Sequence, residues 1–242
     1  MSNSTLDALL QRLRTTSVID QEDVAALGSL PMDLRTLGPA EYVVRDGQRS
    51  TACCLLAEGF CIRAKTTWEG RRQILSIHIP GEIPDLLSLY LHVMDHDLMT
   101  LTDSLVGYIP HTALQDLVRR QPNLVAALWR DSLVDAAMFR EWIVNVGQRP
   151  ATSRLAHIVV ELRARLKVIG RGQGNRIEMP LTQEQIGEAM GITPIHANRI
   201  IKQLREEGVL EFRRGYAVVL DESKLEELAH FDDRYLHLKP SQ

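Results

Sequence analysis

One segment of thirty residues near the C-terminal end restricts the fold of this chain more than any other. It comprises residues 181–210 and reads LTQEQIGEAMGITPIHANRIIKQLREEGVL. Thr182 is placed to cap a helix, because Gln185 follows three residues later and completes a capping box. Gly191 stands where that helix would end in a left-handed turn, a conformation that a residue without a Cβ atom adopts readily. The segment therefore predicts a short helix from Thr182 to Gly191.

A second helix follows directly in the same segment. Thr193 is a capping residue, and Pro194 occupies the first helical position, where its missing N–H costs nothing. Gly208 marks the end of this helix. The apolar positions that predict its buried face are Ala197, Ile200, Ile201 and Leu204. Two short helices joined by a glycine turn predict a helix-turn-helix.

The polar side of the second helix carries groups that suit DNA. Arg199 can pair with guanine O6 and N7, Asn198 with adenine N6 and N7, and His196 can donate to an acceptor edge. We expect these three residues to read bases. The residues expected to contact phosphates are Thr182, Thr193, Lys202 and Gln203. A helix side that is simply solvated would have a similar composition, so the context of the motif matters.

Two features of that context favour nucleic acid. Residues 209–212 and 216–220 are β-prone runs on either side of Arg213-Arg214-Gly215, which predicts a hairpin, or wing, whose Arg213 and Arg214 reach phosphates. Residues 148–216 contain twelve Lys or Arg and seven Asp or Glu, a net charge of +5. The rest of the chain has sixteen basic and twenty-four acidic residues, a net charge of −8. A basic module joined to an acidic one fits attraction to a phosphate backbone.

The N-terminal half has a different pattern. Leucines at helical spacing (Leu6, Leu9, Leu10 and Leu13) predict a short helix within the first twenty-five residues. From about residue 37, β-prone runs alternate with turns that contain glycine, and these runs are residues 42–44, 51–57, 60–66 and 73–79. Such spacing predicts a small antiparallel β-barrel or jelly roll, so the fold class of the chain is α+β.

A long helix is predicted between the two halves, from Pro122 to about Val146. Its apolar residues cover more than one face, and one stripe is enough for packing on its own domain. A second stripe suggests the same helix of another subunit, although a central core helix in a monomer is the alternative. The expected dimer contacts are Leu128, Trp129, Met138, Phe139 and Trp142. Residues 147–150 are expected to form a hinge.

From about residue 37 to residue 220 the sequence resembles the CRP/FNR superfamily of bacterial transcription regulators. The resemblance implies an effector-sensing domain like a cyclic nucleotide-binding domain (residues 1–122), a dimerisation helix and hinge (123–147) and a DNA-binding winged helix-turn-helix (148–236). It also implies a homodimer on near-palindromic double-stranded DNA, with recognition helices about 34 Å apart, and contact with RNA polymerase in an activator.

Three positions of the recognition helix bear on which DNA sequence is read. The family carries a base-reading arginine at the place of Arg199. At Pro194 and Ile195 the best-known members have charged residues instead, so the operator is not predicted.

The resemblance places the effector pocket at Gly81, Glu82, Ile83, Asp85 and Leu86. Members that bind cyclic nucleotide carry an arginine just after this turn, which neutralises the cyclic phosphate. No Lys or Arg occurs in residues 73–118, so we predict that cAMP and cGMP do not bind tightly. Arg63, Arg71 or Arg72 could still reach the pocket from another strand.

Cysteines and histidines give weaker signals. The three cysteines, Cys53, Cys54 and Cys61, are too few for a four-thiolate iron–sulfur cluster within one chain, and buried small side chains are favoured over a redox switch. His92 and His96 would share a helix face and could chelate a metal, and His78 or His92 could bind haem. Satisfied or exposed histidines are the better interpretation, so we predict no metal and no cofactor.

Other classes of protein fit less well. The sequence has no nucleophile elbow, no phosphate-binding loop and no convincing set of two histidines and a carboxylate, which argues against an enzyme. It lacks a run of ~18 apolar residues and an apolar signal segment, so we expect no membrane contact and a cytoplasmic location. A small-molecule-binding module whose C-terminal helices serve only assembly is the alternative function, and the basic polar helix side argues against it.

Overall fold

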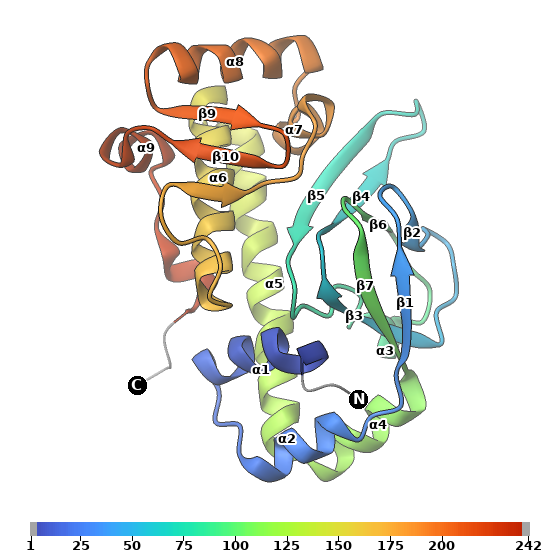
Figure 1. Cartoon of the computed structure of the whole chain (residues 1–242). Coiled ribbons are helices and arrows are strands. Elements are labelled where there is room, and N and C mark those ends of the chain that lie inside the picture. The colour runs from blue at the N-terminus through green and yellow to red at the C-terminus, as the bar shows by residue number, and fades with distance from the viewer. Residues whose placement is uncertain (1–3, 239–242) are drawn as a thin grey trace.

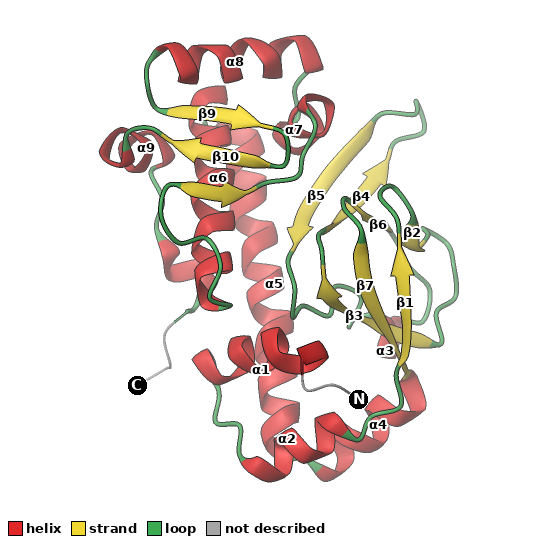
Figure 2. Ribbon diagram, viewed as in Figure 1, coloured by secondary structure: helices red, strands yellow, loops and turns green. Residues whose placement is uncertain are grey.

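The structure, a computed structural model, describes residues 4–238. The N-terminal half comprises α1 (Ser4–Thr16), α2 (Gln21–Gly28), β1 (Asp33–Leu37), β2 (Tyr42–Val44), β3 (Ala52–Glu58), β4 (Cys61–Thr66), β5 (Arg72–His78), α3 (Ser88–Leu91), β6 (Asp97–Thr100), β7 (Ser104–Pro110) and α4 (His111–Arg120). The C-terminal half comprises α5 (Pro122–Gln148), α6 (Ala151–Val168), β8 (Arg176–Glu178), α7 (Gln183–Met190), α8 (Pro194–Glu206), β9 (Leu210–Arg213), β10 (Tyr216–Val219), α9 (Glu222–Ala229) and η1 (Asp233–Leu236). The long helix α5 runs between the sheets of the first half and the domain that α6–α9 form (Figures 1 and 2).

Two antiparallel sheets form the N-terminal domain. One has the strand order β1-β7-β3 and the other β2-β6-β4-β5. Apolar side chains that include Val44, Leu56, Leu98 and Val106 pack together between them. The predicted α+β class and the jelly-roll character are confirmed. A closed barrel is not formed, because the strand ladders in residues 4–238 stay within two separate sheets.

The first residues form two helices, not the single helix that the leucine spacing predicted. Asp20 caps α2 through a capping box with Asp23, with N–H to carboxylate distances of 2.9 and 3.1 Å. This cap starts a new helix in a new direction after α1 has ended at Thr16. α1 lies directly on the turn after β5, where a Cβ atom on Gly81 would come within 2.5 Å of the backbone of Ala8. Glycine at position 81 therefore permits this close packing.

The break after α5 falls in the second half of residues 147–150, the segment predicted as a hinge. Gly147 and Gln148 still belong to the helix, and Arg149 is the first extended residue, with φ −77° and ψ 145°. Pro150 explains the position, since proline disfavours a helical conformation at the residue before it and lacks the N–H that would continue the helix. α6 begins immediately afterwards at Ala151.

One apolar core connects the two domains. Leu155, Val159 and Leu162 of α6 belong to the same buried cluster as the helix-turn-helix, and this cluster extends to Ile77 and Met99 of the N-terminal sheets. The C-terminal sheet, in the order β8-β10-β9, covers another side of α6 (Figure 1). The C-terminal domain is therefore packed against the N-terminal domain as well as against α5.

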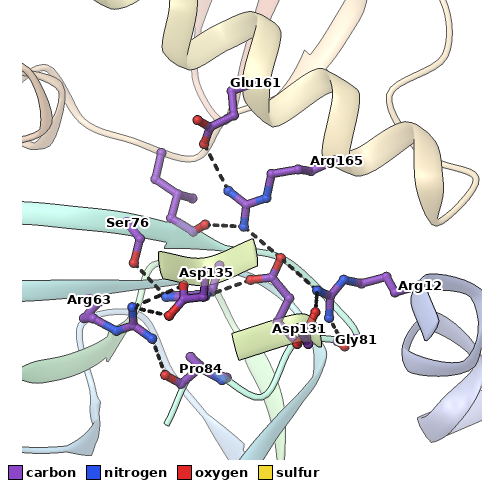
Figure 3. Close-up of polar contacts among 12 residues, drawn as sticks. Arg12, Arg63, Ser76, Gly81, Pro84, Asp131, Asp135, Glu161 and Arg165 are labelled. Carbon is purple, nitrogen blue, oxygen red and sulfur yellow. Dashed lines mark hydrogen bonds and ion pairs between the residues drawn. The ribbon is translucent and has the colours of Figure 1, made fainter. Parts of the chain in front are cut away.

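A buried ion-pair network joins the domains at this contact, and Arg165 of α6 is at its centre (Figure 3). The Arg165 guanidinium donates to Glu82 at 2.8 Å, to the Ile77 carbonyl at 2.7 Å and to Glu161 at 3.3 Å. Burial alone would raise the pKa of Glu82, but the guanidinium groups of Arg165 and Arg12 outweigh it and hold this pKa well below its ordinary value. Glu82 is therefore ionised in the folded protein.

Removal of the Glu82 charge should destabilise the fold. Glu82→Gln leaves Arg165 buried with one fewer carboxylate, so we expect a loss of about 3 kcal/mol in the free energy of unfolding at pH 7, measured by urea denaturation. Because the pKa of Glu82 is lowered by folding, the wild-type advantage should be present above the unfolded-state pKa of about 4.3 and should diminish as the pH falls below it.

The matched control is Glu222→Gln, which removes a half-exposed partner of Arg163, another arginine of α6. Such a surface pair contributes about 1 kcal/mol or less. Equal losses in the two variants would contradict the role assigned to Glu82.

Candidate nucleic-acid interface

The first helix of the motif, α7, has the predicted ends. Thr182 Oγ1 accepts from the Gln185 N–H at 3.2 Å, and Gln185 Oε1 accepts from the Thr182 N–H at 2.8 Å. Gly191 ends the helix with φ 68°, in the left-handed region. A Cβ atom at this position would also lie 2.9 Å from a methyl group of Val146 in α5. Both the turn and its packing on the long helix therefore require glycine at position 191.

The second helix, α8, is oriented by its buried side. Thr193 Oγ1 accepts from the His196 N–H at 3.3 Å, and Pro194 occupies the first turn, as predicted. Ala197, Ile200 and Leu204 are buried in the domain core. Figure 1 shows α8 at the outer edge of the C-terminal domain, at the opposite end of the molecule from α2 and α4. The other side of α8 is therefore open to a partner.

Most of the side chains expected to contact DNA lie on that open side. Asn198, Arg199, Lys202 and Gln203 are exposed, whereas His196 is half-buried at the edge. The Asn198 amide donates to Gln183 Oε1 of α7 at 2.7 Å, in an exposed contact. Within residues 4–238, no hydrogen bond or ion pair engages the Arg199 guanidinium, so its donors are free to meet a base.

Acidic residues lie beside the other polar groups of α8. Lys202 Nζ is 3.6 Å from Glu206, and the Gln203 amide donates to Glu207 at 2.8 Å. These contacts are exposed, and water competes with them. Lys202 can therefore exchange its carboxylate partner for a phosphate at little cost.

The sequence places Ile195 at a recognition position but gives it no contact, and the structure locates it in the first turn of α8. Its side chain is 85% exposed. Successive residues of an α-helix are rotated by about 100°, so Ile195 points almost directly away from the buried Leu204, nine residues later. Asn198, Arg199 and Lys202 follow it on the same helix face. The open side therefore combines one large apolar group with polar and cationic ones.

The hairpin of β9 and β10 forms the predicted wing. Arg213 is held by Glu211 of its own strand at 3.2 Å, and Arg214 at the tip is exposed. The Arg176 guanidinium lies 3.7 Å from the centre of the Tyr216 ring, next to the same tip. Thr182 and Thr193, the other residues expected at phosphates, are exposed at the starts of α7 and α8. The wing tip thus presents cationic groups beside the helix-turn-helix.

A cavity of about 240 Å³ lies between the N-terminal sheets, α1 and α5. Of the residues expected to form an effector pocket, Glu82, Ile83 and Leu86 line this cavity, whereas Gly81 and Asp85 do not. Gly81 lies beneath α1, and Asp85 accepts from the Cys54 N–H at 2.7 Å, where burial raises its pKa to about 6. The expected pocket is therefore only partly formed by the turn after β5.

The cavity also contains two arginines, of which one was predicted only as an alternative and the other was not predicted. Arg63 of β4 lines it, as one open alternative allowed, and Arg12 of α1 was not anticipated. Arg72 instead pairs with Glu188 of α7 at 2.8 Å, and Arg71 pairs with Glu69. Cationic side chains distant in sequence thus enter the cavity from other elements, as the alternative of Arg63 allowed.

Both cavity arginines already have anionic partners (Figure 3). Arg63 donates to Asp135 of α5 at 3.0 Å and to the Pro84 carbonyl. Arg12 donates to Asp131 of α5 at 2.6 Å and to the Gly81 carbonyl at 2.6 Å. The cavity therefore contains charges that neutralise one another.

Comparisons with known proteins agree with this architecture. The model of the Crp-like helix-turn-helix domain matches residues 153–228, and that of the cyclic nucleotide-binding domain matches residues 34–121. The chain is 21% identical over 217 residues to the transcriptional activator protein FnrL of Cereibacter sphaeroides. The aligned region covers 88% of this chain and 86% of FnrL. It is 23% identical over 215 residues to the transcriptional activator protein FnrA of Stutzerimonas stutzeri, and this aligned region covers 89% of this chain and 88% of FnrA. The structure of FixK2 from Bradyrhizobium japonicum matches with a TM-score of 0.74 at 20% identity over 82% of this chain and 98% of that chain.

The chain belongs to the CRP/FNR family of transcription regulators. The predicted family is thus confirmed, and the helix-turn-helix is its DNA-binding domain. FnrL and FnrA are both named as transcriptional activators. No helix in residues 4–238 is long and apolar enough to cross a membrane.

The set of α5 residues expected to form the dimer contact of this CRP/FNR protein needs correction. Leu128, Met138 and Trp142 are buried within their own chain, and the Trp142 indole donates to Glu161 of α6 at 3.1 Å. Phe139 is half-buried, whereas Trp129 is 67% exposed. The large apolar side chains that α5 exposes are Val125, Trp129, Leu133, Ile143 and Val144. Periodicity could not separate these two sets, because it does not show which face α1 and α6 cover.

The cysteines and histidines lie apart from the interface. All three cysteines are buried, and burial raises the pKa of Cys53 to about 12. His92 follows the last turn of α3, whereas His96 is buried beyond it, so the two do not share a helix face. His78 is hydrogen-bonded to Ser76 and Glu82 at 2.8 and 2.7 Å. In the described part of this CRP/FNR protein, no three His, Cys, Asp or Glu side chains form a metal-binding group.

Proposed function

We propose that this regulator binds double-stranded DNA as a homodimer, with α8 of each subunit in successive major grooves of a near-palindromic operator. The observation that carries the proposal is the open side of α8, where Arg199 has no partner in residues 4–238 and lies beside exposed Asn198 and Lys202. Recognition helices place their N-terminal residues against base edges, about 34 Å apart in a dimer. Arg199, Asn198 and His196 would then read bases.

The charge distribution supports the same orientation. The proposed phosphate contacts are Thr182, Thr193, Lys202, Gln203, Arg213 and Arg214. All six belong to the segment with a net charge of +5, whereas the rest of the chain carries −8. An assembly role for the C-terminal helices, the alternative function, would give no reason for an exposed basic side on α8. Because the relatives are named activators, we include contact with RNA polymerase in a cytoplasmic, activating role.

The exposed apolar face of α5 supports the dimer. Val125, Trp129 and Leu133 are spaced by four residues, and Ile143 lies near the C-terminal end of the same helix. Exposed side chains of this size, repeated along one helix, are typical of a helix–helix interface. A symmetric pair of α5 helices would cover them and hold two C-terminal domains at a fixed separation.

We also propose that the sensor cavity does not take cyclic nucleotides tightly. Arg63 would be the partner of a cyclic phosphate, but it is paired with Asp135, and Glu82 and Asp131 also line the cavity. A phosphate would have to displace Asp135 and leave that carboxylate without its partner.

Two substitutions in α8 should separate base reading from phosphate binding. With an operator obtained by in vitro selection, Arg199→Ala should cost about 1–3 kcal/mol of binding and relax specificity at one position of each half-site. Lys202→Ala should weaken operator and random DNA alike and reduce the slope of affinity against salt by about 1. Fluorescence anisotropy at several salt concentrations measures both effects.

Lys224→Ala is the control, since Lys224 is also exposed and also 3.6 Å from a carboxylate, but in α9. It should leave binding nearly unchanged. If both α8 substitutions weakened operator and random DNA by the same factor, the assigned roles would be wrong.

A charge in the apolar face of α5 should separate the subunits. Trp129→Glu would place two like charges opposite each other in a symmetric interface, so we expect monomers at micromolar concentration in sedimentation experiments, with much weaker operator binding. Val18→Glu alters an 80% exposed residue of the α1–α2 connection and should leave the dimer intact. A dimeric Trp129→Glu protein would refute this interface.

Calorimetric titration tests the sensor cavity. The wild-type protein should show no micromolar binding of cAMP or cGMP, whereas Asp135→Asn frees Arg63 and should increase affinity for either nucleotide. Asp33→Asn, which removes an exposed partner of Arg35 outside this cavity, is the matched control. Micromolar affinity of the wild-type protein would contradict the proposal.

A further inference from the structure

Ile195 has a position that the packing of α8 does not explain. It is 85% exposed, and its direction is opposite to the buried side of the helix. Replacement of Ile195 by a smaller or polar residue would cost the folded protein little stability, since the isoleucine side chain buries almost no surface there. An exposed isoleucine forfeits the free energy that burial of its methyl groups would supply. A partner that covers it would recover that free energy.

The surroundings of Ile195 restrict what the partner can be. Asn198 and Arg199 are the next residues on the same face, and Arg199 presents free donors in the described structure. Pro194 and Thr193 at the start of α8 are exposed as well. An apolar protein surface would bury these polar groups without partners, at considerable cost. A surface that offers acceptors and an apolar group side by side fits the whole face.

The major groove of DNA is such a surface. Base edges there carry hydrogen-bond acceptors and donors, and the one apolar group is the C5 methyl of thymine, which side chains recognise by contact. We propose that Ile195 is a specificity-determining residue that contacts a thymine methyl in each half-site. The inference rests on the proposed function, because it requires α8 to enter the groove. Ile195 and Arg199 are one helical turn apart, about 6 Å, so the thymine lies within about two base pairs of the base that Arg199 reads.

The test removes only the methyl group. After selection of an operator with the full-length protein, each thymine of the half-site is replaced in turn by deoxyuridine, which keeps every hydrogen-bonding group. At one position near the Arg199-dependent base, the wild-type affinity should fall about fourfold for one half-site and about fifteenfold for both, as expected for one methyl group. Ile195→Ala should lower affinity for the thymine operator and bind thymine and uracil operators equally at that position.

Two controls accompany the test. Ile195→Val keeps both γ-carbons that a methyl group can touch, so it should retain part of the preference for thymine. Val18→Ala truncates an equally exposed apolar residue far from α8 and should retain all of it. Circular dichroism checks that the variants are folded, which the exposure of Ile195 leads us to expect.

The possible outcomes distinguish failure of the role proposed for Ile195 from failure of the proposed function. An enriched operator with no methyl-sensitive thymine near the Arg199-dependent base would overturn the role of Ile195 while leaving the proposed function standing. An Ile195→Ala protein that still prefers thymine to uracil would overturn it as well. Failure to enrich any sequence would overturn the proposed function, and the role of Ile195 with it.

Discussion

The position of the DNA-binding domain depends on one buried guanidinium, that of Arg165. It contacts Glu82 and the Ile77 carbonyl of the N-terminal domain, and Glu161 of its own helix. A buried charge is tolerated only while its partners remain, so α6 cannot turn away from the N-terminal sheets without a large electrostatic cost. α7 and α8 pack on α6 through the common core, and their direction follows from this contact.

Glu161 extends the same constraint to the end of the described chain. It accepts from the Trp142 indole of α5 and, at 2.7 Å, from the Tyr235 hydroxyl of η1, while it pairs with Arg165. One carboxylate therefore links α5, α6 and η1. On the other side, Glu82 both pairs with Arg165 and lines the sensor cavity. The groups that neutralise the cavity and those that fix the C-terminal domain are thus parts of one network.

Sequence reasoning predicted what local signals determine. The caps at Thr182 and Thr193 and the left-handed turn at Gly191 depend on residues a few positions apart, and they form as expected. The ion pairs of the network join residues far apart, such as Arg165 with Glu82 and Arg12 with Asp131, and no local pattern reveals them. This is why Arg12 was not anticipated in the cavity and Arg63 was only one of three alternatives.

The error at the long helix has the same origin. An apolar residue of α5 is a core residue if α1 or α6 covers it and a contact residue if neither does. Periodicity gives both kinds the same signature. Met138 is buried whereas Trp129 is 67% exposed, because the folded chain covers only the first of these two apolar side chains.

The proposed binding mode would allow the open side of α8 to be selective for DNA sequence although its cations are partly neutralised. Lys202 has Glu206 beside it, and Arg213 of the wing has Glu211, so the attraction of these cations to phosphate is moderated. Phosphates are identical in every sequence, and a face that relied on them would bind all DNA alike. In the proposed complex, less phosphate attraction leaves a larger share of the binding free energy to groups whose partners differ between base pairs, namely the donors of Arg199 and Asn198 and the methyl groups of Ile195. An exposed apolar residue in the first turn of α8 therefore fits the proposal that specificity comes from base edges, whereas charge supplies general attraction to DNA.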